Sequence, residues 1–271
     1  MTRGKLLIKK DFVSVIVPIY KQEKTIKKDL ERINQVLSQT RFDYEIIAVV
    51  DGKKIDHSFK EAKKLKLPKI KVVGYQDNYG KGYAVRFGMA RSKGDKIAFI
   101  DAGMDIDPNG LSMILEHMEW YDADIIVGSK RHPASQVKYP ILRKIYSLGY
   151  QILVRILFGL KIKDTQTGLK VFKRKVLVAV LPRLLIKRFA FDVELLAVAH
   201  RLGFKRIYEA PVKIDSERFK LSSTIKFKTI FEMLLDTAAI FYRLKILRYY
   251  DDNNKRKWRY DKELNFRVNI G

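Results

Sequence analysis

The chain of 271 residues carries 55 Lys and Arg residues against 30 Asp and Glu residues, which gives a formal net charge of +25 at pH 7. Its length and its hydrophobic content of 47% are sufficient for one large α/β domain with an appendage, or for two small domains. The absence of cysteine excludes a disulfide framework, a thiolate metal site and a cysteine nucleophile, and it favours a protein of the cytoplasm or its membrane face.

Short apolar runs alternate with amphipathic segments along most of the chain. Runs rich in β-branched residues predict buried strands, and apolar residues that recur every three or four positions predict helices. In chain order, strands are expected at residues 12–18, 44–50, 70–75, 96–100, 123–129, 169–172 and 204–212. Helices are expected near residues 25–37, 57–65, 82–90, 139–160, 176–180, 192–202 and 225–248, with a further helix from about residue 111. This alternation predicts an α/β fold with a mostly parallel sheet and helices on both of its faces.

Polar residues follow the expected strands at the edge where their carboxyl ends meet, which is where open α/β sheets bind ligands. The segments at this edge are residues 18–20, 51–52, 77–81 and 101–107. Residues 78–82 combine two glycines with Lys81 at the start of a helix, an arrangement that lets backbone approach a phosphate. This segment matches neither of the common glycine-rich nucleotide-binding patterns, and a simple tight turn is an equally good interpretation of it.

Three carboxylates, those of Asp101, Asp105 and Asp107, come directly after a short apolar strand. Clustered carboxylates at a strand end need a positive partner, which can be a neighbouring Lys or Arg or a divalent cation with hard oxygen ligands. The alternative is a capped turn that leads into the helix near residue 111.

Positive charge is unevenly distributed, because Asp164 is the only acidic residue between Ile125 and Phe191. Such a surface favours an anionic partner, which could be nucleic acid, anionic lipid or a phosphorylated substrate. The helix expected at residues 139–160 has an apolar stripe formed by Ile141, Ile145, Leu148, Ile152 and Ile156. Three basic residues interrupt this helix, so it is predicted to lie in a membrane interface or, alternatively, to pack on its own domain.

Residues 1–220 are expected to form the main domain, residues 221–250 a C-terminal amphipathic helix, and residues 251–271 a charged tail that is flexible or loosely docked. The apolar face expected for the C-terminal helix consists of Ile230, Leu234, Ala238 and Phe241. Asp192 is either the N-cap of its helix or a residue of the site. The first apolar run is interrupted by charged residues, so no signal peptide is expected.

The order and spacing of these pieces resemble the family 2 glycosyltransferases, specifically the polyprenyl-phosphate sugar transferases, which include the dolichol-phosphate mannose synthases and the dolichyl-phosphate glucosyltransferases. The resemblance covers roughly residues 13–249. It is carried by residues 15–20 with Glu23 and by residues 45–52, 78–84, 99–102, 127–131, 164–168, 191–195 and 218–223. It implies the GT-A fold, the Rossmann-like sheet of nucleotide-sugar transferases, with amphipathic helices at the membrane interface.

The resemblance also implies a nucleotide-sugar site. The residues expected to hold the donor nucleotide are Pro18, Tyr20, Glu23, Asp51, Lys81 and Asp101. Asp101 would match the first Asp of the family's Asp-x-Asp motif, which binds Mg²⁺ or Mn²⁺ to the donor diphosphate. Because Gly103 stands where the second Asp is usual, Asp105 is expected to supply the other metal ligand, with Asp107 as a weaker candidate.

For the acceptor, the resemblance implies that Arg131, Arg143 and Ser147 contact a lipid phosphate. The loop that carries Arg218 would close on the donor diphosphate, and Asp101, Arg218 and Asp192 are expected to carry the reaction. A lipid monophosphate has a second pKa of about 6, so it can attack without a strong protein base. Single displacement would invert the anomeric centre. UDP-glucose and GDP-mannose are both candidate donors. Residues 80–89 and 190–195 look closer to the glucosyl branch, and the alternative is ordinary drift within the family.

The expected partners are a nucleotide sugar, a polyprenyl or dolichyl phosphate, an anionic membrane surface, and either a membrane-anchoring subunit or further copies of the chain. Such a protein would be cytoplasmic and peripherally bound to the membrane. The rival interpretations are a glycosyltransferase of the same fold with a non-lipid acceptor, a non-catalytic scaffold and a nucleic-acid-binding protein. The acidic sheet edge argues against a nucleic-acid partner, because it would repel phosphates in the absence of a metal ion.

Overall fold

The computed structural model describes residues 11–137, 141–188, 190–214, 227–254, 257–264 and 266–269, and for residues 141–145, 227, 228 and 269 it describes the backbone alone. The large sheet has seven strands in the order β3-β2-β1-β4-β6-β5-β7. These strands are β1 (Phe12–Ile19), β2 (Asp43–Asp51), β3 (Ile70–Tyr75), β4 (Lys96–Ile100), β5 (Ile125–Ser129), β6 (Leu169–Lys173) and β7 (Ile207–Pro211). Only β6 runs antiparallel to its neighbours in this sheet, so the predicted mostly parallel sheet is confirmed.

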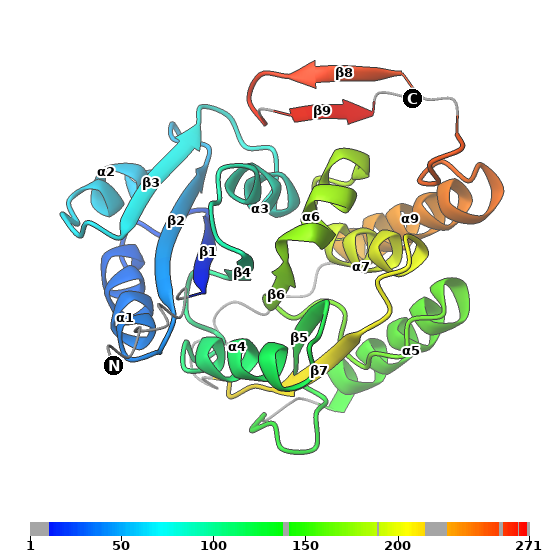
Figure 1. Cartoon of the computed structure of the whole chain (residues 1–271), viewed down its shortest axis with the longest axis horizontal. Coiled ribbons are helices and arrows are strands. Elements are labelled where there is room, and N and C mark those ends of the chain that lie inside the picture. The colour runs from blue at the N-terminus through cyan, green and yellow to red at the C-terminus, as the bar shows by residue number, and fades with distance from the viewer. Residues whose placement is uncertain are drawn as a thin grey trace, which may run out of the picture.

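Helices cover both faces of the sheet (Figure 1). The helices along the chain are α1 (Ile26–Ser38), α2 (Ser58–Lys63), α3 (Lys81–Ala90), α4 (Gly110–Trp120), α5 (Ile141–Phe158), α6 (Arg174–Val180), α7 (Phe191–Arg201) and α9 (Phe227–Phe241). A short 3-10 turn (Leu181–Arg183) follows α6, and a π-helical turn (Tyr242–Ile246) follows α9. Each expected helix therefore has a counterpart, with ends that shift by a few residues.

The alternation of side chains along each strand separates two apolar cores. In β4, Ile97 and Phe99 face a core that also contains residues of α3, α6 and α7, whereas Ala98 and Ile100 face a core that contains residues of α1 and α4. Because successive side chains of a strand point to opposite faces, an apolar run of this kind is stable only when both faces are covered. This burial on both sides fixes the strand ends whose polar residues form the site.

The part of the predicted apolar stripe of α5 whose side chains are described faces outward. Leu148, Ile152 and Ile156 are 48%, 49% and 74% exposed, while Val154 and Phe158 on another side of the helix are 2% and 4% exposed and belong to the core. The helix thus packs on its own domain and also presents an apolar surface. No helix in the described ranges is both long and apolar enough to cross a membrane.

The C-terminal tail is more ordered than its composition indicated. Strands β8 (Trp258–Asp261) and β9 (Phe266–Asn269) pair as an antiparallel hairpin, which Figure 1 shows beside α3 and α6. Tyr250 is fully buried and donates a hydrogen bond of 2.7 Å to Glu194 Oε1, and Leu264 is buried in the same core. The segment expected as a charged tail thus contains a hairpin, and Leu264 and Val268 of this segment are buried in the core.

Candidate active site

The carboxyl ends of β1, β2 and β4 and the start of α3 surround one cavity of about 390 Å³, which we call the donor cavity. The predicted residues that line it are Pro18, Tyr20, Asp51, Lys81, Asp101 and Asp105. Asn78, in the segment 77–81 that was expected at this edge, also lines it, as do Gln22 and Arg188, which were not singled out from the sequence. The strand-end argument thus brings together residues that are far apart in the chain, whereas Arg188 comes from the segment before α7, whose placement the sequence pattern does not reveal.

Asp51 holds the glycine-rich turn in place. Its carboxylate accepts hydrogen bonds from the backbone N–H groups of Tyr79 (2.8 Å) and Gly80 (3.0 Å) and from the side-chain amide of Asn78 (2.9 Å). Gly80 has φ = 98° and is the N-cap of α3, a conformation that favours glycine. Asp51 therefore has two roles: it lines the donor cavity, and it fixes the turn that forms part of the cavity wall.

Glu23 lies outside the residues that line the donor cavity. Its Oε2 accepts a hydrogen bond of 3.0 Å from the backbone N–H of His57, and its own N–H donates to Asp56 Oδ2. Glu23 thus joins the loop after β1 to the start of α2. The structure gives it a bonding role beside the cavity rather than the place in its wall that the resemblance implied.

Asp101 is the acidic centre of the donor cavity. Its Oδ2 lies 2.8 Å from Lys81 Nζ, and its Oδ1 is buried without a hydrogen-bond partner among the described residues. Burial acts to lower the pKa of Lys81, but the charges of Asp101 and Asp192 outweigh it and raise that pKa. The sequence had left open a lysine or a cation as the partner of this carboxylate. The lysine is present, and one oxygen remains available for a cation.

The loop after Asp101 turns back on itself. Gly103 and Met104 have φ values of 93° and 58°, and the side chain of Met104 is buried, so the chain reverses and Asp105 lines the same cavity as Asp101. Asp107 has another role, because it pairs with Arg32 at 3.4 Å and accepts a hydrogen bond from the N–H of Asn109. The capped turn and the carboxylate pair therefore both occur, on different residues of one loop.

These carboxylates fit a divalent cation that is shared with a ligand. The described part of the chain contains no group of three His, Cys, Asp or Glu residues that could hold a metal ion by itself. Mg²⁺ commonly binds through one or two carboxylates together with substrate phosphates. The unpartnered oxygen of Asp101 and the nearby Asp105 are a donor set of that kind.

A buried ion pair lies directly behind the donor cavity. Lys170 in β6 is fully buried, and its Nζ lies 2.7 Å from Asp192 Oδ1 and donates to the carbonyl of Thr167 at 2.6 Å. Lys81 Nζ lies 3.8 Å from the other oxygen of Asp192. The N-cap interpretation of Asp192 is wrong, because Ala190 occupies the N-cap of α7. The sequence signal for this pair was Lys170, which stands inside the otherwise apolar run Leu169–Phe172.

The turn at residues 164–168 packs against Asp101. The N–H of Asp101 donates to the carbonyl of Gly168 at 2.9 Å, and a Cβ atom on Gly168 would lie 1.9 Å from Asp101 Oδ2. No side chain can occupy that position without displacing the carboxylate. The glycine of this turn is therefore a steric requirement of the donor cavity.

A second, basic cavity of about 660 Å³ lies between the end of β5 and α5. It is lined by Lys130, Arg131, His132, Ser135, Val137, Ser147, Leu148, Gln151 and Lys163, and we call it the basic cavity. Arg131 donates a hydrogen bond to Gln151 Oε1, which ties the loop after β5 to α5. Arg131 and Ser147 thus lie in one cavity, as the resemblance implied. The side chain of Arg143 and the whole of Arg218 lie outside the described residues.

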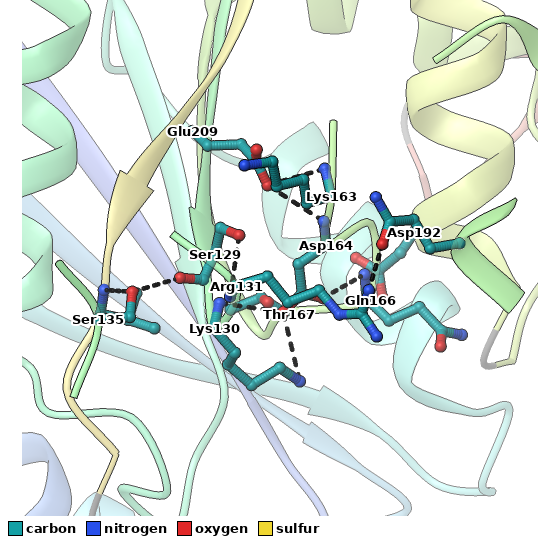
Figure 2. Close-up of polar contacts among 12 residues, drawn as sticks. Ser129, Lys130, Arg131, Ser135, Lys163, Asp164, Gln166, Thr167, Asp192 and Glu209 are labelled. Atoms are coloured by element: carbon teal, nitrogen blue, oxygen red, sulfur yellow. Dashed lines mark hydrogen bonds and ion pairs between the residues drawn. The ribbon is translucent and has the colours of Figure 1, made fainter. Parts of the chain in front are cut away.

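Asp164 connects the basic cavity to the interior. It accepts a hydrogen bond from the N–H of Lys130 at 3.1 Å, and its Oδ2 lies 3.7 Å from Lys130 Nζ (Figure 2). Burial acts to raise the pKa of Asp164, but the charge of Lys130 and the hydrogen bonds to the carboxylate outweigh it and lower that pKa. The turn that begins at Asp164 thus contacts the basic cavity at one end and Asp101 at the other.

Comparison with known proteins gives one consistent family. The profile described as Glycosyl transferase family 2 matches residues 14–181. A dolichyl-phosphate beta-glucosyltransferase of Trichomonas vaginalis is 34% identical over 253 residues, which cover 87% of this chain and 75% of that protein. The enzyme of that name from Dictyostelium discoideum is 32% identical (86% and 74% covered), and the Homo sapiens enzyme is 30% identical (87% and 76%).

Solved structures share the fold at low sequence identity. Glucosyl-3-phosphoglycerate synthase of Mycobacterium tuberculosis, in complex with Mn²⁺, UDP-glucose and phosphoglyceric acid, aligns with a TM-score of 0.64 at 16% identity and covers 92% of this chain and 84% of that one. Mannosyl-3-phosphoglycerate synthase of Rubrobacter xylanophilus aligns with a TM-score of 0.65 at 14% identity, covering 96% and 84%. The predicted GT-A fold is confirmed.

Proposed function

The chain belongs to glycosyl transferase family 2, and on that premise we propose that it transfers glucose from UDP-glucose to a polyprenyl or dolichyl phosphate. The observation that carries the proposal is the match to relatives named dolichyl-phosphate beta-glucosyltransferase, which extends over 86–87% of the chain. The family profile, which matches residues 14–181, includes every residue that lines the two cavities except Arg188. The test is transfer of labelled glucose into lipid, with GDP-mannose as the competing donor.

In the donor cavity, each group has a separate task. A divalent ion held by Asp101 and Asp105 would stabilise the charge of the leaving UDP. Lys81, whose raised pKa keeps it cationic, would lie beside the diphosphate and maintain its pairing with Asp192. Asp51 would keep the turn at residues 78–80 in position for the nucleotide. Arg218 is proposed to close on the diphosphate from its loop.

The basic cavity suits the acceptor. A monophosphate with a second pKa of about 6 is mostly dianionic near neutral pH and is attracted by Lys130, Arg131 and Lys163. Asp192 would position Lys81, because both of its oxygens already face lysines and no strong base is required. Direct attack of the phosphate oxygen on the anomeric carbon would convert the α-linked sugar of UDP-glucose into a β-linked product.

Arg131→Ala should raise the KM for the lipid phosphate about tenfold or more, since a charge-assisted hydrogen bond contributes of that order. The KM for UDP-glucose should change little, because Arg131 does not line the donor cavity. The matched control is Lys175→Ala, which removes one positive charge that is paired with Asp124 outside both cavities. An equal rise in both KM values, or an equal effect of the control, would contradict an acceptor role.

We further propose that the protein binds the membrane through α5 and α9, which are joined by a 2.8 Å hydrogen bond between Tyr150 and Thr237. The exposed apolar residues of this surface are Tyr146, Leu148, Ile152, Ile156, Phe231, Leu234 and Leu235. An apolar face flanked by basic residues is typical of a helix that lies in a membrane interface. The basic cavity includes Ser147 and Leu148 of α5, so the acceptor phosphate would enter beside this surface.

The double variant Ile152→Asp/Ile156→Asp should weaken binding to vesicles that contain anionic lipid by about tenfold or more, because each change removes an apolar side chain from the interface. Sedimentation with vesicles measures the effect. Val178→Asp is the matched control, since Val178 is an exposed aliphatic residue (66%) on α6. Equal binding of the double variant and the wild type would exclude this surface as the contact.

A further inference from the structure

The C-terminal hairpin contacts the helix that begins at the donor cavity. Tyr83 of α3 donates a hydrogen bond of 2.6 Å to Glu263 Oε2. Arg91, directly after α3, donates a hydrogen bond to the backbone carbonyl of Glu263. The guanidinium of Arg86 lies 5.6 Å from the ring centroid of Phe266 in β9. Glu263 and β9 lie outside residues 14–181, which the family profile matches, so this contact is an addition to the matched region.

An aromatic cluster continues from Tyr83 to the glycine-rich turn. The ring centroid of Tyr83 lies 5.0 Å from the ring centroids of Tyr75 and Tyr79. The rings of Tyr75 and Tyr79 stack with their centroids 5.3 Å apart. The backbone N–H of Tyr79 in turn donates to Asp51. A continuous path of contacts therefore runs from Glu263 to the residues that line the donor cavity.

Asp51 restrains the turn at residues 78–80 from the side of β2, and its other side depends on α3. Gly80 and Gly82 permit many backbone conformations, and the N-terminus of α3 has no side-chain cap. The Tyr83 ring is buried and immediately follows this segment, so its orientation constrains the path of residues 78–82. Burial and the hydrogen bond to Glu263 raise the pKa of Tyr83, so its phenol remains a hydrogen-bond donor at neutral pH.

We infer that the hairpin positions the turn at residues 78–81, with Tyr83 and Glu263 as positioning residues for binding of the nucleotide. The identity of the ligand in this inference rests on the proposed function. The effect of the hairpin on the conformation of the turn does not depend on it. Neither residue lines the donor cavity, so their effect passes through the turn. The nucleoside diphosphate proposed for the donor cavity would lie beside Lys81, at the start of α3.

The test compares the wild type with Tyr83→Phe and Glu263→Gln by hydrogen exchange and by UDP titration in Mn²⁺. Both variants should speed exchange of the Tyr79 and Gly80 amides and weaken UDP binding about tenfold, since each loses a hydrogen bond to a charged group. The double variant should be no weaker than either single variant, because both remove one contact. The KM for lipid phosphate should remain unchanged.

Asp252→Asn is the matched control, because it breaks an ion pair between the tail and Arg183 that does not touch α3. Unchanged exchange of the Tyr79 and Gly80 amides in both test variants would overturn the inference, whatever the measured affinity for UDP. If Asp252→Asn speeds exchange of these amides equally, the inference is also overturned, because any weakening of the contacts of the tail would then produce the effect. Faster exchange in a protein that binds no UDP would support the restraint and refute the proposed donor instead.

Discussion

Asp101→Asn should lower kcat/KM for glucose transfer about 10³-fold, which corresponds to about 4 kcal/mol of lost transition-state stabilisation. The change keeps the shape of the side chain but removes the charge of a carboxylate whose Oδ1 has no partner in the described protein. It would leave Asp51 and Asp105 as the other carboxylates among the described residues that line the donor cavity. The measurement is initial rates with UDP-glucose and dolichyl phosphate at saturating Mn²⁺.

Asp107→Asn is the matched control for this prediction. It removes one negative charge from the same loop, but Asp107 pairs with Arg32 and caps a turn instead of lining the donor cavity. Its activity should stay within about threefold of the wild type, because exposed ion pairs contribute little. An Asp101→Asn enzyme with more than about one tenth of wild-type activity would show that this carboxylate is dispensable.

Lys170→Met should lower the free energy of unfolding by about 3 kcal/mol, because it leaves the buried carboxylate of Asp192 without its nearest partner. Lys81, at 3.8 Å from Asp192, compensates in part, so the loss should fall at the low end of the range for a broken buried pair. Urea denaturation, followed by the two tryptophans, measures this loss.

Two further variants make the stability prediction specific to the pair. Lys173→Met, on the same strand, removes a lysine whose partner Asp122 is exposed, and it should cost less than about 1 kcal/mol. The double variant Lys170→Met/Asp192→Leu replaces the buried pair with apolar side chains and should recover most of the loss. If the double variant is as unstable as Lys170→Met, the lysine stabilises the fold through something other than Asp192.

The sheet was predictable because its strands are short apolar runs, and β1, β2, β4 and β5 are buried on both faces. The direction of β6 was not, because whether a strand runs parallel or antiparallel depends on how its connection crosses the sheet, and residues 130–168 contain no pattern that specifies this. The hairpin strands were missed because each has only four residues. Their alternation in Trp258–Asp261 and Phe266–Asn269 is clear once the pairing is known.

The amphipathic helices show a different limit. In α5, apolar residues occur on several sides, so the pattern identifies the helix but not the side that is buried. Val154 and Phe158 enter the core, while Leu148, Ile152 and Ile156 of the predicted stripe remain exposed. The same holds for α9 and the turn after it, where Ile240 and Leu244 are buried while Leu234 is exposed. The side of such a helix that is buried depends on the elements that pack against it, and these elements are distant in the sequence.

For the site, the strand-end rule was sufficient to gather Pro18, Asp51, Lys81 and Asp101 around one cavity. Glu23, which the resemblance and not this rule assigned to the donor nucleotide, does not line the cavity and bonds to the start of α2. The buried pair of Lys170 and Asp192, and the close approach of Gly168 to Asp101, required three-dimensional positions that spacing along the chain cannot supply.

The most direct test of the proposed function uses purified protein with UDP-[¹⁴C]glucose, dolichyl phosphate and Mn²⁺, followed by organic extraction. We expect label in the organic phase as a β-linked glucosyl phospholipid, abolished by Asp101→Asn and much weaker with labelled GDP-mannose. Absence of lipid-linked label from UDP-glucose, together with efficient transfer from GDP-mannose or to a water-soluble acceptor, would contradict the proposal.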